Sequence, residues 1–296
     1  ATIGAAGGEV KLELGDGAVA TLQVPAGAVD RDLPITLSKV VSIEEGGSPV
    51  FGVELAPGGL MFPPSASPTL TITGVPGDHL AWMADSDGVF ERPAAFLAAD
   101  GTLRIGVPHF STAGSAPPGA APVPPATFGE GLYAELSRLV AEMAKRQAAD
   151  QPYGDIEQQI DAVLDRIRQT WVEPLLDAAA SKCGAKRAVS EALRLQRSRE
   201  LLARDRGLDT KRIAAALRHE AECARIDCKN GKDTAAGLFA WVLRSKMLLD
   251  VEDGTEQAMV KELQTTFQGC MLLRLGVRMR GDIILSGGGA SFAFAE

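Results

Sequence analysis

The tripeptide His109-Phe110-Ser111 places a base and a hydroxyl group within three residues of each other. A serine hydroxyl is a poor nucleophile until a base accepts its proton, and His109 is the residue that could do so for Ser111. A serine that follows a His-Xaa pair can cut its own backbone, so the tripeptide is a candidate self-processing site. The alternative is that His109 and Ser111 form hydrogen bonds within a strand or a turn. We favour this alternative, because cleavage also requires backbone strain.

A second pattern, in residues 219–223, is similar to part of a zinc-binding helix. His219 and Cys223 are one helical turn apart, which lets two side chains bind the same zinc ion, with Glu220 as a general base. However, Cys223 takes the place of the second histidine of a His-Glu-x-x-His motif, and the other two histidines lie within the first 110 residues. Because a catalytic zinc site needs a third protein ligand, we predict no metal site and no cofactor, with Cys223 in a disulfide.

The cysteines all lie in the second half of the chain. They are Cys183, Cys223, Cys228 and Cys270. Four cysteines fit two disulfides, with three alternative pairings. A bridge from Cys183 or Cys270 to the central pair would close a loop of about forty residues and stabilise the fold by a few kcal/mol. Disulfides are typical of exported proteins, so we predict a secreted, periplasmic or cell-surface protein. The alternative is four buried thiols in a cytoplasmic protein.

Charge is distributed unevenly along the chain. Residues 1–115 contain 13 acidic and 5 basic side chains, a net charge of −8, whereas the remainder contains 25 of each. Neither part has the basic stripe that neutralises phosphates, so we predict no nucleic-acid partner. No run of 18 apolar residues occurs, and we therefore predict no membrane span.

The secondary structure expected to position these histidines and cysteines changes from strands to helices at a proline-rich stretch. Before it, apolar residues alternate with polar ones in short runs separated by Gly, Pro and Asp. Examples are Val10, Leu12 and Leu14; Phe51, Val53 and Leu55; and Leu103, Ile105 and Val107. This pattern predicts an antiparallel β-sandwich over residues 1–114. Residues 115–127 contain five prolines and no charge and should form a semi-rigid connector.

After the connector, the apolar period becomes helical, and we expect an all-α bundle of about six helices over residues 128–273. One stripe comprises Ile156, Ile160, Val163, Leu164, Ile167 and Trp171. Asp209, Asp233 and Thr255 each follow a glycine or come two residues after one, and we predict them as helix N-caps. The fold class is thus a multidomain α+β protein.

Residues 274–296 have strand-like apolar runs and form a short C-terminal β segment in our prediction. Two strands alone are marginal in water. They could pack on the bundle, join the β-sandwich, or begin a further, truncated domain, and we favour the last of these.

Four motifs in the first third are similar to those of a known family. They are Val24-Pro25-Ala26-Gly27-Ala28-Val29, Ile35-Thr36-Leu37, the segment 55–62 with Pro68-Thr69-Leu70-Thr71-Ile72, and His109-Phe110-Ser111. In this order they resemble the ZU-type β-sandwich domain of zonula occludens proteins, netrin receptors and ankyrins, which also occurs in bacterial cell-surface proteins. The resemblance covers about residues 7–113, and the helical remainder resembles no family that we recognise.

The resemblance implies protein binding or spacing. In some death-domain adaptors, a similar module cleaves itself between Phe and Ser of a His-Phe-Ser segment, so the scissile bond here would be Phe110-Ser111. The Ser111 hydroxyl would attack the Phe110 carbonyl, and water would hydrolyse the ester formed by this N→O acyl shift. This chain departs from those adaptors, because Thr112-Ala113 replaces the aromatic residue that often follows and helices replace the second β-domain.

We therefore expect a non-enzymatic extracellular or periplasmic interaction and spacer protein with an unidentified protein partner. One alternative is a self-processing β-domain that cleaves at Phe110-Ser111. A further alternative is a helical ligand-binding domain tethered by the β-module.

Overall fold

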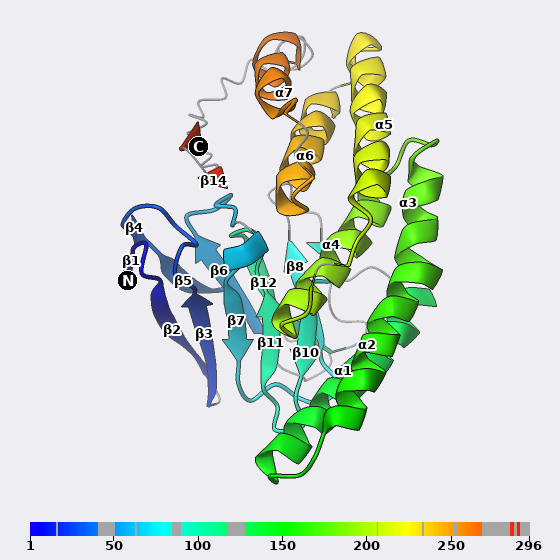
Figure 1. The fold of residues 1–296 in the computed structure, drawn as a ribbon. Helices are drawn as coiled ribbons and strands as arrows, with labels where there is room; N and C mark the ends of the chain where they lie inside the picture. Colours follow the sequence, from blue (N-terminus) through cyan, green and yellow to red (C-terminus); the bar gives the residue numbers. More distant parts are fainter. Residues whose placement is uncertain are drawn as a thin grey trace. The chain divides into compact units, whose positions relative to one another are not determined.

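The computed structural model of the chain combines antiparallel sheets with helices, which confirms the prediction of a mixed α+β protein (Figure 1). The structure describes residues 1–15, 17–40, 51–62, 64–84, 90–117, 128–205, 207–232, 234–251, 254–267, 285–286 and 289–290. The chain forms two compact units. The first comprises Ala1–Ile167, Arg197–Arg204 and Asp282–Ala295, and the second comprises Arg168–Gln196 and Asp205–Gly281.

One five-stranded antiparallel sheet of the first unit has the order β10-β11-β7-β3-β2. Its strands are β10 (Ala95–Leu97), β11 (Leu103–Gly106), β7 (Thr69–Ile72), β3 (Ala18–Val24) and β2 (Gly8–Gly15). The register pairs Leu22 with Leu70, and Leu70 with Ile105. All three side chains are fully buried, so one face of the sheet is apolar, as the alternating sequence predicts.

A second five-stranded sheet has the order β5-β6-β12-β8-β9. Its strands are β5 (Thr36–Val40), β6 (Phe51–Ala56), β12 (Thr112–Ala116), β8 (Leu80–Ala84) and β9 (Phe90–Glu91). The central strand β12 is built from small residues, and a Cβ atom on Gly114 would lie 1.9 Å from the Phe51 carbonyl oxygen. Glycine is therefore required where β12 passes β6.

Strand β12 also extends beyond the predicted start of the connector. Ser115 and Ala116 pair with Ala81 and Leu80 of β8, so the first two residues of segment 115–127 belong to the sheet. Most of that segment lies outside the described residues. Side chains from both five-stranded sheets belong to a single buried apolar cluster. A further pair of short strands, β1 (Thr2–Ile3) and β4 (Leu33–Pro34), accompanies them.

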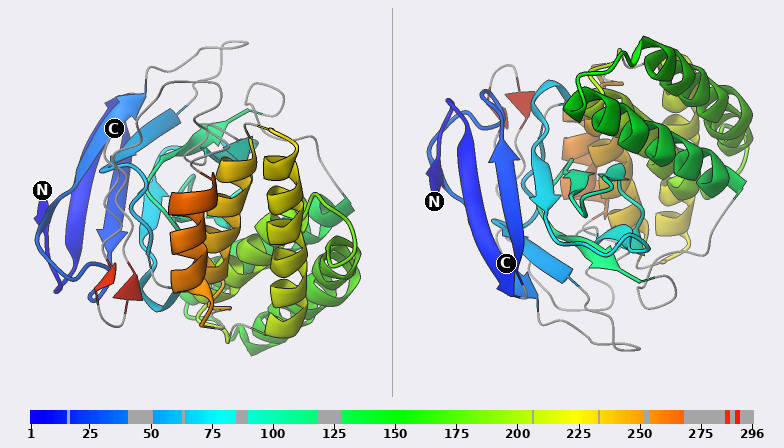
Figure 2. Two further views of the ribbon diagram at one scale, coloured as in Figure 1. Left: turned by 90° about the horizontal axis from the view of Figure 1, so that it is seen from above. Right: turned by 90° about the horizontal axis from the view of Figure 1, so that it is seen from below.

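Two helices belong to the first unit with the strands. Helices α1 (Phe128–Ala148) and α2 (Gly154–Ile167) lie side by side as a helical hairpin (Figure 2). The α1 helix contacts β10, and the Arg92 guanidinium lies 3.1 Å from the Glu130 carboxylate at the start of α1. The first compact unit therefore extends past the strands and includes both helices of this hairpin.

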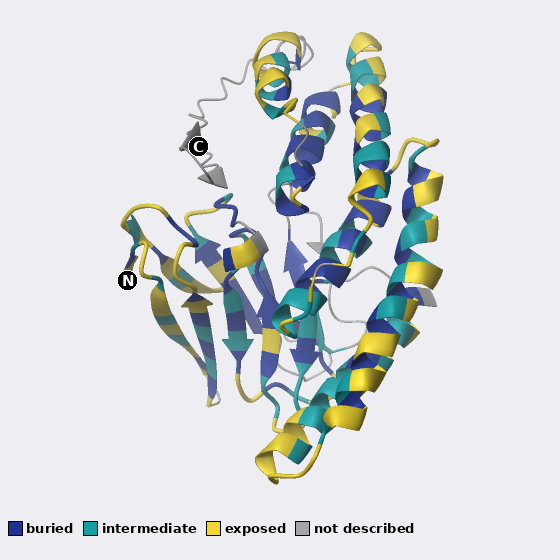
Figure 3. Cartoon of the chain, viewed as in Figure 1, coloured by how far each residue is buried: buried dark blue, intermediate teal, exposed yellow. Residues whose placement is uncertain are grey.

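The apolar stripe of α2 is buried on one side of the helix, and the opposite side is exposed (Figure 3). At Arg168–Val172 the helix continues as a π-helical turn, so Trp171 is not part of a regular α-helical stripe. Arg204, beyond the end of α4, lies 2.7 Å from Asp161 on the exposed side of α2. This ion pair joins segment 197–204 to α2 within the first unit.

The second unit contains the remaining helices, most of them joined by short connections. They are α3 (Glu173–Ala179), α4 (Lys186–Leu201, which continues into the first unit), α5 (Thr210–Lys229), α6 (Ala235–Leu248) and α7 (Glu256–Glu262), the last followed by a π-helical turn at Leu263–Phe267. Phe239 of α6 stacks on Phe267 at 4.3 Å between ring centroids. Of the described residues, no helix has the length and apolarity needed to cross a bilayer.

Two of the predicted N-caps lie within the described residues, and they differ. The Asp209 carboxylate accepts hydrogen bonds from the backbone N–H groups of Lys211 and Arg212 at 2.9 and 3.4 Å, which confirms this cap. Thr255 occupies the position before α7 but makes no capping bond, because its backbone lies in the αR region rather than in the extended region of a capping residue. Its hydroxyl accepts a 2.9 Å hydrogen bond from the Lys246 ammonium. Asp233 lies outside the described residues.

The C-terminal β segment is described only at β13 (Leu285–Ser286) and β14 (Gly289–Ala290), which pair with each other in antiparallel fashion. The remainder of the predicted strands in residues 274–296 lies outside the described residues.

Candidate functional site

The loop between α3 and α4 brings Cys183 to the side of α5, where it forms a disulfide with Cys223. The two Cα atoms are 5.9 Å apart, although 40 residues separate them in sequence. The bridge is one of the pairings that the sequence left open. No cysteine among the described residues is free, and Cys228 is also disulfide-bonded. Cys270 lies outside the described residues.

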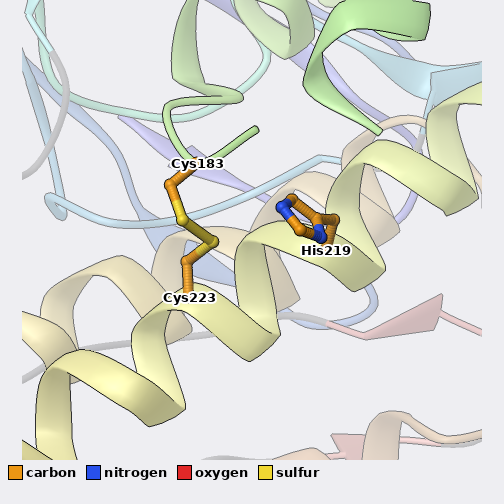
Figure 4. A group of neighbouring side chains, drawn as sticks. All are labelled: Cys183, His219 and Cys223. Carbon is orange, nitrogen blue, oxygen red and sulfur yellow. A yellow bond between two sulfur atoms is a disulfide. The ribbon is translucent and has the colours of Figure 1, made fainter. Parts of the chain in front are cut away.

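The imidazole of His219 lies beside this disulfide (Figure 4). One ligand atom each from Cys183, His219 and Cys223 lies within 4.8 Å of the other two. His219 and Cys223 come from the same face of α5, as their four-residue spacing predicts. We call these three residues the Cys183–His219–Cys223 cluster. The two sulfurs of the cluster are bonded to each other and are therefore not thiolates. The thiolate is the form of cysteine that binds metals, so the oxidised cluster lacks two of its three ligands.

Glu220 forms hydrogen bonds with the loop that contains Cys183. Its side chain is 2% exposed, and one carboxylate oxygen accepts hydrogen bonds from the backbone N–H groups of Gly184 and Ala185 at 2.7 and 2.9 Å. These N–H groups directly precede the N-terminus of α4, where a negative charge interacts favourably with the helix dipole. In a metallohydrolase Glu220 would be the general base, but here its carboxylate caps a helix and holds a loop.

The tripeptide His109-Phe110-Ser111 leads into β12 and is anchored by its backbone. The Phe110 N–H donates a 2.7 Å hydrogen bond to the Leu60 carbonyl, and the Phe110 carbonyl accepts a 2.9 Å bond from the Gly59 N–H. The Phe110 side chain is fully buried, with its ring packed edge-on against Phe62 at 4.8 Å between centroids. His109 is also buried, and Ser111 is half-buried.

The described residues His109, Phe110 and Ser111 do not have backbone angles in the left-handed region. Of the described residues other than glycine, those in the left-handed region are Asp150, Ala203 and Asp250. The carbonyl of Phe110 accepts a hydrogen bond from the Gly59 N–H, and an oxyanion site of the usual kind supplies two such donors. The backbone of this segment pairs with residues 59–61 just before β12 begins.

A buried pair that sequence reasoning did not identify lies on β12 and the loop before β8. His79 Nδ1 is 3.2 Å from the Ser115 hydroxyl, and the two side chains are 4% and 0% exposed. Burial lowers the pKa of His79, and the nearby Asp78 carboxylate offsets part of that effect. His79 and Ser115 are 36 positions apart in the sequence and form no local motif, so only the pairing of β12 with β8 brings them to notice.

Comparison of the chain with protein-family models, with curated proteins and with solved structures found no match. The resemblance to ZU-type domains remains a prediction from the four motifs.

Proposed function

We propose that this chain is a non-enzymatic interaction and spacer protein that works in an oxidising compartment outside the cytoplasm. The observation that carries the proposal is the anchoring of Phe110. Its N–H, its carbonyl and its ring all make contacts within the fold. These contacts support a structural role for the segment that has the best nucleophile and base pattern. The Cys183–Cys223 disulfide supports the compartment, because disulfides persist where glutathione does not reduce them.

The proposal includes a ZU-type β-sandwich in the first unit. Its support is the single buried cluster shared by two five-stranded antiparallel sheets, an arrangement typical of sandwiches. The segment 55–62, one of the family-like motifs, supplies the backbone groups that anchor Phe110. Two of the motifs quoted for the resemblance therefore meet in space.

The partner that best fits the first unit is a protein with a neutral or basic surface. Residues 1–115 carry a net charge of −8, which attracts basic surfaces and repels phosphate groups. Strand β2 is an edge of its sheet, with Glu9, Lys11 and Glu13 exposed along it. We propose this edge, defined by those three residues, as the contact surface.

Intact mass and a photo-cross-linking series test the two parts of this proposal. The full chain, kept for days and then denatured, should retain its unbroken mass, as should the Ser111→Ala variant. An N-terminal fragment of about 110 residues in the wild type alone would instead support self-processing by nucleophilic attack of Ser111.

For the interaction, a photo-reactive residue is placed at Lys11 on the β2 edge and, as a matched control, at Lys229 on α5. Adducts in cells of the source organism should form at Lys11 and weaken as salt is raised, because exposed charge pairs are screened. Equal adducts at both positions, or none at Lys11, would contradict the proposed surface.

A further inference from the structure

We propose that the Cys183–His219–Cys223 cluster is a zinc site closed by oxidation. As a disulfide the cluster binds no metal, and when a dithiol reduces it, the two sulfurs and the imidazole bind one zinc ion. This goes beyond the proposed function, in which the disulfide serves only as support for an oxidising compartment.

The donor set and its spacing fit zinc. The three ligand atoms already lie within 4.8 Å of one another, and ligands of a tetrahedral zinc ion are about 3.5–3.8 Å apart for the usual Zn–S and Zn–N distances. Two thiolates and one imidazole are ligands that zinc prefers, and three protein ligands leave a fourth position for water. The sulfurs need only move apart to about 3.8 Å once their bond is broken.

The cluster keeps its arrangement by contacts other than the disulfide. His219 and Cys223 are fixed relative to each other by α5, and Glu220 of the same helix holds the N–H groups of Gly184 and Ala185, next to Cys183. The Lys186 ammonium, at the start of α4, also lies 5.9 Å from the centre of the Trp241 ring. Reduction therefore leaves Cys183 close to the other two ligands, and Glu220 acts as a positioning residue.

Access is provided from the side of Cys183. Cys183 is exposed, His219 is half-buried and Cys223 is buried, so an external thiolate reaches the Cys183 sulfur first. Attack there forms a mixed disulfide and releases Cys223, and the second thiol of the reductant then frees Cys183 as the reductant becomes a disulfide. Two electrons and two protons pass to the cysteines. Zinc binding then releases those two protons, because both sulfurs bind as thiolates.

The test uses the full chain with Cys228→Ser and Cys270→Ser, so that only the proposed site can supply thiolates. The oxidised protein should bind no Zn²⁺ in a chelator competition assay. After anaerobic reduction with a dithiol and removal of the reductant, it should bind one Zn²⁺ per chain. Co²⁺ in place of zinc should give a thiolate charge-transfer band and the intense visible bands of a tetrahedral site.

Three variants assign the ligands. Cys183→Ser should abolish the charge-transfer signal of a two-thiolate site, and His219→Ala should weaken zinc binding at least tenfold. Glu220→Gln should weaken zinc binding and leave the Co²⁺ spectrum unchanged, because this substitution affects the position of Cys183 and leaves the three metal ligands the same. Glu222→Gln, an exposed neighbour on α5, is the matched control and should bind as the parent does.

A folded reduced chain that binds no Zn²⁺ or Co²⁺ overturns the proposal, and so does unchanged affinity in His219→Ala. Where reduction unfolds the second unit, helicity measured by circular dichroism gives a second readout. Added Zn²⁺ should restore the helicity of the reduced parent protein and should not restore that of His219→Ala. If Zn²⁺ restores helicity in neither protein, the proposed site is wrong. None of these outcomes depends on the binding partner or on cleavage at Phe110, so they are separate from tests of the proposed function.

Discussion

The first and second units each place a histidine close to a second reactive group, but in different kinds of element. In the first unit, His109 and Ser111 flank a residue whose N–H and carbonyl are both used in pairing with segment 59–60. In the second unit, the backbone of α5 satisfies its own hydrogen bonds, and the side chains of His219 and Cys223 project to one side where Cys183 meets them. Strand pairing thus fixes the backbone around Phe110, whereas the helix satisfies its own backbone bonds and leaves its side chains free to converge with Cys183.

The largest effect that separates the two regions is expected from Phe110→Ala. Removing a fully buried phenylalanine ring that packs on Phe62 should lower the free energy of unfolding of the first unit by about 3–5 kcal/mol. Hydrogen–deuterium exchange during a denaturant titration measures the stability of each unit separately. Ser111→Ala, next to it and half-buried, should cost about 1 kcal/mol or less. Similar small costs for both would mean that Phe110 is not an anchor.

Loss of the Cys183–Cys223 bridge is expected to act on the second unit alone. For a loop of 40 residues, the chain-entropy relation gives about 4 kcal/mol of stabilisation, which the Cys183→Ser, Cys223→Ser double variant would lose. Exchange protection should fall in α3 and α5 and stay unchanged in β6 and β12. Equal loss in both units would show that the bridge stabilises the chain as a whole.

A smaller effect is expected from Glu220→Ala. It leaves the N–H groups of Gly184 and Ala185 without their carboxylate partner and should cost about 2 kcal/mol, as is usual for hydrogen bonds to a charged group. Glu222→Ala removes an exposed ion pair with Arg225 and should cost well under about 1 kcal/mol. Thermal unfolding of the two variants side by side gives the comparison. Equal costs would contradict the role of Glu220 in holding the loop.

The smallest effect is a pH dependence in the first unit. The pKa of His79 is lowered in the folded protein, so the unfolded chain binds more protons as the pH falls below about 6.5. The contribution of His79 is therefore complete above that pH and is lost as the pH falls from there through the lowered folded pKa. Denaturant titrations between pH 7 and 4.5 should show a shallower decline in His79→Asn than in the wild type. Parallel curves would exclude His79 as a cause.

The strands and their burial could be read from the sequence to a large extent. The alternation of Leu103 and Ile105 appears in β11, and the Asp209 cap starts α5, because both depend on residues close together in the chain. The pairing of Cys183 with Cys223 and of His79 with Ser115 could not be read, since each joins segments 36 to 40 residues apart. Thr255 shows the same limit at short range, because its backbone lies in the αR region, which its residue type and its place after Gly254 do not predict.

The order of the second sheet has a consequence for any attempt to isolate the first unit's strands. Strands β5 and β6 form one ribbon, β8 and β9 form another, and β12 is the single strand that joins them. Two-stranded ribbons are marginal in water, and an unpaired edge invites association with other chains. A fragment that stops at Phe110 lacks β12 altogether, and one that stops at residue 114 loses its pairing with Leu80 and Ala81. Fragments that end before Ala116 should therefore aggregate, so expression boundaries belong after residue 117.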